Sequence, residues 1–150
     1  MTFKLSKRSL SKLDGVKPKL VEVVKSAISI TAVDFGVIEG VRSIETQRKY
    51  LAAGKTQTMK SKHLTGDAVD LMAYVGSTPS WEVDLYDDIA FAMKIAAIDS
   101  DVRIRWGGAW HINDICEYQD DMSCAMNEYI DLRRSQGKRP FIDAVHFELS

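Results

Sequence analysis

The sequence predicts an α+β fold in which a small antiparallel sheet carries helices packed on one side. Segments with the apolar period of helices are mixed with short alternating segments typical of strands, without the strict alternation that builds a parallel sheet. The 150 residues, 45% hydrophobic and 27% charged, contain no internal repeat and no linker long enough to separate two domains. We therefore expect one domain that spans residues 1–150.

The first half of the chain contains four predicted elements: a helix over 18–28, a strand over 35–41 that ends near residues 40–42, a short helix over 43–51 and a strand over 67–74. Pro18 suits the first turn of a helix, where its missing N–H has no partner to lose. Ser43 is a favourable N-cap, and Gly54 is a favourable stop for the same helix. Between the second helix and the second strand, residues 55–64 predict a polar loop.

The second half predicts a helix over 84–98, a strand over 102–106 closed by two glycines, a more helical than extended segment over 116–134, and a terminal strand over 142–149. In the terminal strand, Val145, Phe147 and Leu149 share one face. His146 and Glu148 share the other, because side chains alternate along a strand.

Composition and charge exclude several functions. No apolar run approaches the roughly 18 residues that span a bilayer, so we expect no membrane insertion. The first 15 residues have no apolar core after their lysines, which predicts synthesis in a cytoplasm without a signal peptide. The net charge of −1 and the absence of zinc-finger or RNA-binding motifs argue against nucleic acid, and the basic N-terminal segment is best explained as a solvated helix face. Cys116 and Cys124 are expected to be reduced thiols without a function.

The three histidines are the residues best suited to chemistry. A catalytic zinc needs three nitrogen or oxygen ligands and one open position for water. His63, Asp70 and His146 offer two imidazoles and one carboxylate, a set that suits zinc. Gly66 would let the loop turn so that His63 returns beside the strand that carries Asp70. The spacing alone is a weak signal.

Two gapped motifs resemble those of a known family. Residues 61–70 follow the pattern S-x-H-x-x-G-x-A-x-D, which resembles the first signature of the D-alanyl-D-alanine metallopeptidases. Residues 143–146, D-x-x-H, resemble the second motif. The W-G-G-x-W segment at 106–110 and the terminal H-F-E-L at 146–149 are similar to the short phage endolysin branch, which cleaves between L-alanine and D-glutamate in peptidoglycan stem peptides. The resemblance covers residue 37 to the C-terminus and implies the fold shared by hedgehog-like domains and D-Ala-D-Ala peptidases.

Carried over by position, the resemblance implies that His63, Asp70 and His146 bind Zn²⁺ within one zinc peptidase catalytic domain. It implies that Asp143 is the general base and acid, which takes a proton from the zinc-bound water and gives it to the leaving amine. Arg42 would stabilise the oxyanion on the scissile carbonyl. Relatives that act on D-alanyl-D-alanine have glutamate at the base position, whereas the phage branch accepts the aspartate found here.

Alternatives stay open for several of these residues. In a regular strand Asp143 and His146 would point to opposite faces, so Asp143 should lie in a turn or bulge before the strand. Glu148, which shares a face with His146, is the alternative base. Arg42 has an alternative as a surface partner of Glu39 or Glu45.

Other residues are open between a functional and a structural role. His111 is expected to be a surface or groove residue, because a fourth protein ligand would close the zinc site. Trp106 and Trp110 are equally compatible with packing and with substrate contact. A group of acidic residues is compatible with a calcium ion, although a solvated face is favoured; these are Asp114, Glu117, Asp120 and Asp121.

The resulting hypothesis is a monomeric endolysin that hydrolyses the L-alanyl-D-glutamate bond of bacterial peptidoglycan. Such an enzyme would be made in the host cytoplasm and reach the cell wall after another protein opens the membrane. One alternative keeps the metal and changes the bond, giving a D-alanyl-D-alanine carboxypeptidase or dipeptidase. Another is a non-catalytic module in which zinc serves folding or partner binding.

Overall fold

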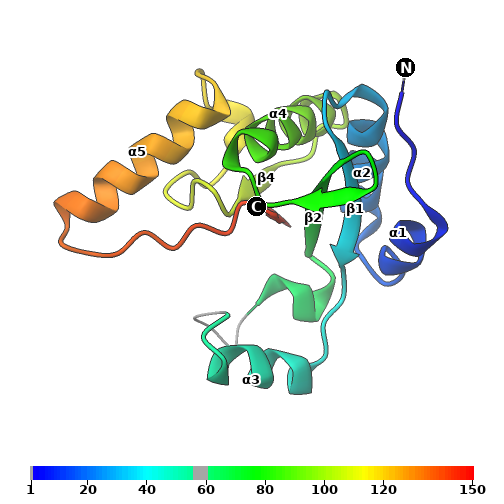
Figure 1. Ribbon diagram of the computed structural model, residues 1–150, viewed down its shortest axis with the longest axis horizontal. Coiled ribbons are helices and arrows are strands. Elements are labelled where there is room, and N and C mark those ends of the chain that lie inside the picture. The colour runs from blue at the N-terminus through cyan, green and yellow to red at the C-terminus, as the bar shows by residue number, and fades with distance from the viewer. Residues whose placement is uncertain (1, 56–60) are drawn as a thin grey trace.

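The computed structural model describes residues 2–55 and 61–150 (Figure 1). Its helices, strands and 3₁₀ helices (η) are, in chain order, α1 (Lys7–Lys12), α2 (Pro18–Ile30), β1 (Asp34–Glu39), α3 (Ile44–Ala52), η1 (Lys62–Thr65), β2 (Ala68–Val75), β3 (Thr78–Ser80), α4 (Val83–Asp99), β4 (Ile104–Trp106), η2 (Ile115–Glu117), α5 (Met122–Ser135) and β5 (His146–Leu149). No helix among these residues combines the length and the apolar character needed to cross a membrane.

The sheet has the strand order β1-β2-β5-β4, with β3 paired to β2, and every pair is antiparallel. The C-terminal strand therefore lies between β2 and β4, although β3, α4, β4 and α5 separate it from β2 in sequence. In this register Asp70 is opposite His146 on one side and Glu39 on the other. Three segments that are distant along the chain thus meet at one point of the sheet.

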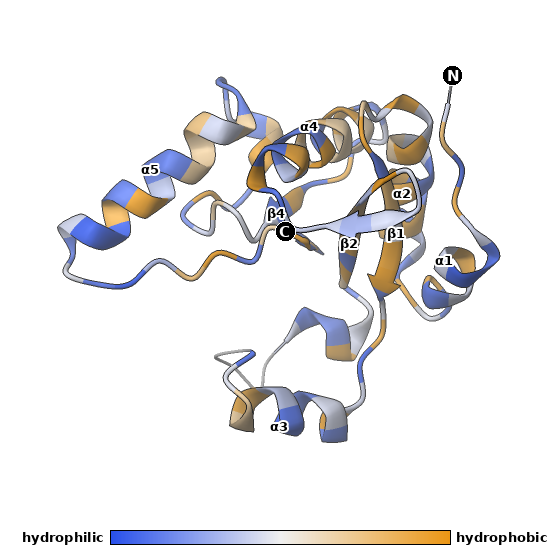
Figure 2. Cartoon of the chain, viewed as in Figure 1, coloured by the Kyte–Doolittle hydropathy of each residue, from blue (hydrophilic) through white to orange (hydrophobic). Residues whose placement is uncertain are grey.

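One face of the sheet packs on helices. α2 and α4 contact each other, and α4 also contacts β2 and β4 (Figure 1). The buried strand residues of this core are Phe35, Val37, Val69, Leu71, Ala73, Ile104, Trp106 and Phe147. β1 is largely hydrophobic, whereas α3, which stands apart below the sheet, carries mostly hydrophilic residues (Figure 2). The predicted α+β class and the helix-covered antiparallel sheet are confirmed.

The opposite face carries polar residues. Asp70 alternates with the core residues Val69 and Leu71, as the period of two predicted. His146 and Glu148 alternate with Phe147 in the same way. The expected division of the terminal strand into two faces is confirmed, whereas β2 is buried on both faces from Ala68 to Ala73.

Every predicted element differs from the structure in at least one bound, and the predicted range is too long for four of them, β1, β4, α5 and β5. β1 ends at Glu39 and excludes Val41, because beyond Glu39 the backbone pairs with η1: the Arg42 N–H donates to the His63 carbonyl at 2.9 Å. β4 and β5 begin later than predicted, at Ile104 and at His146. The helix predicted over 116–134 begins at Met122, where Asp121 caps it.

Two elements were not predicted, α1 and β3, because six and three residues are too short to display a period. α1 is fixed by Ser9, which is buried and accepts a hydrogen bond from the Val37 N–H at 3.0 Å. The predicted polar loop over 55–64 is wrong in its last residues, where η1 forms. Residues 56–60 of that prediction lie outside the described residues.

Gly66→Ala tests the turn that brings η1 back to β2. Gly66 has φ +77°, and an added Cβ would lie 2.5 Å from the Gly15 carbonyl oxygen. We expect a loss of more than about 2 kcal/mol in the free energy of unfolding, from both backbone strain and the clash. Gly76→Ala is the matched control, because Gly76 has φ +64° but open space around it, and should lose about 1 kcal/mol. Equal losses in urea unfolding would contradict the close approach.

Asp87→Asn tests a half-buried carboxylate on α4. Burial raises the pKa of Asp87 to about 6, helped by the negative charges of Asp84, Asp88 and Asp121. The folded-state pKa is above the unfolded value, so the stability contributed by the protonated form is present at pH 4 and lost as pH rises through 6.

After discounting for partial exposure, we expect Asp87→Asn to add about 1 kcal/mol at pH 8, or about 3 °C in Tm. The gain should disappear at pH 4. Asp88→Asn removes an exposed charge from the same turn and serves as control. A gain that is equal at both pH values would show that ionisation of Asp87 is not its cause.

Candidate active site

His63, Asp70 and His146 bring three potential ligand atoms together. The distances are 3.0 Å from His63 Nε2 to Asp70 Oδ1, 3.2 Å from His146 Nδ1 to the same oxygen, and 3.2 Å between the two ring nitrogens. Tetrahedral zinc with bonds near 2.1 Å places its ligand atoms about 3.3 Å apart. The three atoms therefore form a triangle of the size that one face of a zinc tetrahedron requires.

Hydrogen bonds at the far side of each ring orient the histidines. His63 Nδ1 lies 2.8 Å from the Gly40 carbonyl oxygen, and His146 Nε2 lies 2.8 Å from Glu148 Oε1. Because a carbonyl and a carboxylate only accept, these nitrogens carry the protons. The lone pairs of His63 Nε2 and His146 Nδ1 therefore face Asp70, the arrangement found around protein-bound zinc. The donor set fits a zinc ion.

Without a metal, protonation supplies the positive charge. Burial lowers the pKa of His146, but hydrogen bonds to Asp70 and Glu148 outweigh it and raise the pKa to about 9. Burial alone would raise the pKa of Asp70, but hydrogen bonds from both histidines hold it well below its usual range. The carboxylates of the cluster thus favour positive charge at this point of the cleft.

Glu148 has a supporting position. Its Oε2 lies 3.4 Å from Lys62 Nζ, while Oε1 accepts the proton of His146. Burial opposes ionisation of Glu148, but His146 and Lys62 lower its pKa. Both oxygens are therefore engaged, and the geometry favours an orienting role for Glu148 over the alternative role of base. The sequence carried the signal for this contact, since residues 146 and 148 share a strand face.

Arg42 is buried beneath the cluster. Its Nε and Nη2 donate to the two carboxylate oxygens of Glu39 at 2.6 and 2.8 Å, and Nη1 donates to Gln47 at 2.7 Å. Nη2 also lies 3.8 Å from Asp70 Oδ2. The alternative of a surface pair is therefore wrong in part: Glu39 is the partner, but the pair is largely buried and Glu45 instead faces Lys49.

Asp143 lies in a turn immediately before β5, as the strand period predicted. Its carbonyl accepts the His146 N–H at 3.0 Å, and its N–H donates to the Gly107 carbonyl at 2.9 Å. A Cβ on Gly107 would lie 2.2 Å from the Asp143 carbonyl oxygen, so only glycine permits this approach. Burial, then the charge of Asp70, raises the pKa of Asp143 to about 6.

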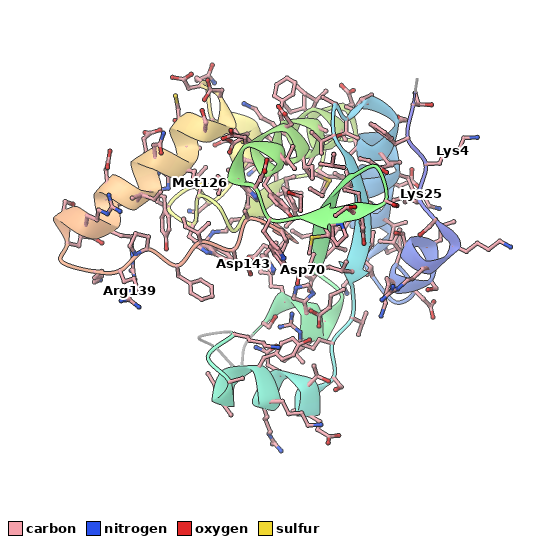
Figure 3. The ribbon with its side chains drawn as sticks, in the orientation of Figure 1. Lys4, Lys25, Asp70, Met126, Arg139 and Asp143 are labelled. Atoms are coloured by element: carbon pink, nitrogen blue, oxygen red, sulfur yellow. The ribbon has the colours of Figure 1, made fainter. Side chains whose placement is uncertain are left out.

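A cleft of about 900 Å³ contains the cluster, Asp143 and Arg42. Asp70 and Asp143 lie in the region between the sheet, α3 and the segment that follows α5 (Figure 3). Aromatic and cationic side chains line the cleft: Tyr50, Trp81, Trp110, Tyr129, Phe141, Lys55, Lys62, Arg105 and Arg133. Such walls suit a peptide that carries negative charge.

The structure separates the residues that the sequence left open between a functional and a structural role. His111 is exposed, stacks on Tyr129 with ring centroids 6.0 Å apart and is outside the cluster. Trp106 is fully buried in the core. Trp110 lines the cleft, with its ring centroid 5.3 Å from that of His146.

Two of the acidic residues considered for calcium have structural contacts. Asp114 caps η2 by accepting from the Cys116 N–H at 3.0 Å. Asp121 caps α5 by accepting from the Cys124 N–H at 2.9 Å. Both cysteines are free thiols. Asp114 and Asp121 therefore have helix-capping roles, and the side chain of Asp114 is only 10% exposed, so it is not part of a solvated face.

Comparisons with known proteins, like the geometry of the site, indicate a peptidase. The sequence model of the family described as "Phage L-alanyl-D-glutamate peptidase" matches residues 1–150. The L-alanyl-D-glutamate peptidase of Escherichia phage T5 is 29% identical over 126 residues, which cover 81% of this chain and 90% of that protein. That of Listeria phage A118 is 32% identical over 74 residues, covering 49% of this chain and 25% of that protein.

A solved structure extends the likeness to the fold. The crystal structure of the Serratia marcescens L-Ala D-Glu endopeptidase ChiX is 34% identical and superposes with a TM-score of 0.74, covering 99% of this chain and 91% of that one. The resemblance found in the two sequence motifs is confirmed over the whole chain. The chain belongs to the phage L-alanyl-D-glutamate peptidase family.

Proposed function

We propose that the chain is a zinc-dependent endopeptidase that hydrolyses the L-alanyl-D-glutamate bond of peptidoglycan stem peptides. The observation that carries this proposal is the meeting of His63 Nε2, Asp70 Oδ1 and His146 Nδ1 within 3.2 Å of one another, in a family named for that activity. The two ring tautomers support a metal at this point, and the ligand types favour zinc.

The proposal includes the setting in which the enzyme acts. All of the proposed site residues belong to one chain, so a monomer with a single catalytic domain over residues 1–150 would be sufficient for the activity. The related phage enzymes support a role in lysis, in which the enzyme reaches the wall of the host after the membrane has been opened by another protein.

His63, Asp70 and His146 would hold the zinc ion, which when bound polarises the scissile carbonyl and lowers the pKa of the attacking water towards about 7. Gly40 and Glu148 keep the two imidazoles in the tautomers that present their lone pairs. Lys62 in turn forms an ion pair with Glu148, and this pair helps to hold Glu148 in the position that orients His146.

Asp143 is the proposed general base and acid. As a base it takes a proton from the attacking water, and as an acid it delivers that proton to the leaving amine of D-glutamate. A pKa of about 6 suits both steps near neutral pH, since the group is ionised before attack yet basic enough to accept a proton. Backbone hydrogen bonds with Gly107 and His146 hold Asp143 in place.

Arg42 is proposed to stabilise the oxyanion on the scissile carbonyl. Three of its five N–H groups donate to Glu39 and Gln47, so its guanidinium is held rigidly with two N–H groups left for other acceptors. A fixed cation at this position costs no reorganisation when negative charge develops on the substrate. The same cation, 3.8 Å from Asp70, also favours the ionised form of that ligand.

Asp143→Asn tests the chemical step. We expect kcat to fall by a factor of about 10² to 10⁴, because the amide cannot accept the proton of the attacking water. Zinc content, measured by plasma mass spectrometry, should be unchanged. Asp99→Asn, at an exposed carboxylate on α4, is the control and should keep full activity.

The same experiment identifies the bond that is cleaved. For this, the wild-type enzyme digests purified peptidoglycan and the products are identified by mass spectrometry. Cleavage at the proposed bond leaves L-alanine on the glycan and gives peptides that begin with D-glutamate. Release of D-alanine with intact L-Ala–D-Glu linkages would instead indicate a carboxypeptidase or dipeptidase. Full activity of Asp143→Asn would eliminate Asp143 as the base.

The variants His63→Ala and His111→Ala test whether the cluster binds zinc. Each removes one imidazole, but only His63 belongs to the cluster. After dialysis against a weak chelator, we expect the His111 variant to retain one zinc per chain and the His63 variant to lose it. Equal zinc retention by the two variants would rule out the proposed ligand set.

A further inference from the structure

Two buried donors in the cleft have no hydrogen-bond partner, namely Arg105 Nε and Trp110 Nε1. Among the described residues, the one other buried side-chain atom without a partner is an oxygen of Asp87 on α4, which does not line the cleft. Buried polar groups in proteins are paired with few exceptions. Two unpaired donors in one cleft therefore indicate a missing acceptor.

Arg105 projects from the sheet on the face that carries the candidate site. Its neighbours in β4, Ile104 and Trp106, are fully buried in the core, so the alternation of the strand turns Arg105 to the other face. In register, Arg105 is opposite Glu148, the residue that orients His146.

Trp110 connects Arg105 to the cluster. Arg105 Nη2 donates to the Trp110 carbonyl, and the guanidinium carbon lies 5.2 Å from the centroid of the Trp110 ring. The same ring lies 5.3 Å from the ring of His146. Arg105 and His146, a proposed metal ligand, therefore lie close to the same indole ring.

The charge of Arg105 has no acidic partner within 4 Å in the described part of the chain. Glu148, its cross-strand neighbour, is engaged by His146 and Lys62. Arg42 in the same cleft is already paired with Glu39. Arg105 is thus a cation with a free donor, held in place by an aromatic ring and a carbonyl.

We propose that Arg105 and Trp110 bind a carboxylate of the stem peptide on the leaving-group side of the scissile bond. This inference rests on the proposed function and adds the feature of the substrate that is recognised. The D-glutamate of a stem peptide is joined onward through its side chain, so its α-carboxylate is free and its α-carbon carries the scissile nitrogen. A second source of the same chemistry is the free carboxylate of the diaminopimelate that follows. Arg105 Nε and Trp110 Nε1 are the donors that either carboxylate would accept.

The test compares three synthetic stem peptides: the unmodified peptide, one amidated at the D-glutamate α-carboxylate, and one amidated at the free diaminopimelate carboxylate. We expect the wild-type enzyme to cleave one of the amidated peptides with a KM at least tenfold higher than that of the unmodified peptide. In Arg105→Gln the KM for the unmodified peptide should rise to the same level, and kcat should change little, because the contact is made equally in the ground state and the transition state.

Two further variants separate recognition from structure. Arg105→Lys keeps the charge and should restore part of the preference for the carboxylate. Trp110→Phe keeps the ring against His146 but removes the N–H, and should raise the KM only for the peptides that keep the recognised carboxylate. Arg103→Gln is the matched control, because Arg103 is two residues away, is exposed and does not line the cleft.

The outcomes are distinguishable from failure of the proposed function. If the wild type does not cut the L-Ala–D-Glu bond of any peptide, the proposed function fails. If it cuts all three peptides with equal KM, or if Arg105→Gln raises the KM for all three by the same factor, carboxylate recognition by Arg105 is wrong while the enzyme activity stands. Loss of discrimination against one amidated peptide identifies the carboxylate that is bound. Circular dichroism and zinc content of each variant verify that the fold and the metal site are intact.

Discussion

The antiparallel pairing of β2 with β5 is the constraint on which the site depends. It places Asp70 opposite His146, and the turn at Gly66 returns His63 to the same point. Because side chains alternate along strands, a shift of one residue in this register would move Asp70 to the core face. The hydrophobic residues beside Asp70 and His146, such as Val69 and Phe147, therefore help to fix the geometry of the site.

The same pairing brings charged side chains together in the protein interior, where unpaired charges would lower the stability of the fold. Asp70, His146, Glu148 and Arg42 are all largely buried, and each has a partner of opposite sign or a hydrogen bond. Burial of charge without such partners destabilises a fold strongly. The network from Glu39 to Glu148 thus satisfies its own charges and leaves the ligand atoms facing one another, which is the arrangement a bound cation would complete.

Much of the site could be predicted from particular residues. The spacing of the two motifs indicated His63, Asp70 and His146, and the period of a strand required Asp143 to precede β5. The contacts of Arg42 with Gln47, and of His63 with the Gly40 carbonyl, were not predictable. Both depend on how the chain turns after β1, where the backbone leaves β2 and pairs with η1.

The sequence by itself determined the fold class, the longer helices and the types of residue that could hold a metal, because apolar periods and ligand chemistry are local properties. The tertiary structure alone decided which faces meet. It buried Trp106 but left Trp110 in the cleft, gave Glu148 a partner in Lys62, and left the donors of Arg105 and Trp110 without one. These outcomes depend on strand order and register, which join segments that are distant in the chain and which no local pattern specifies.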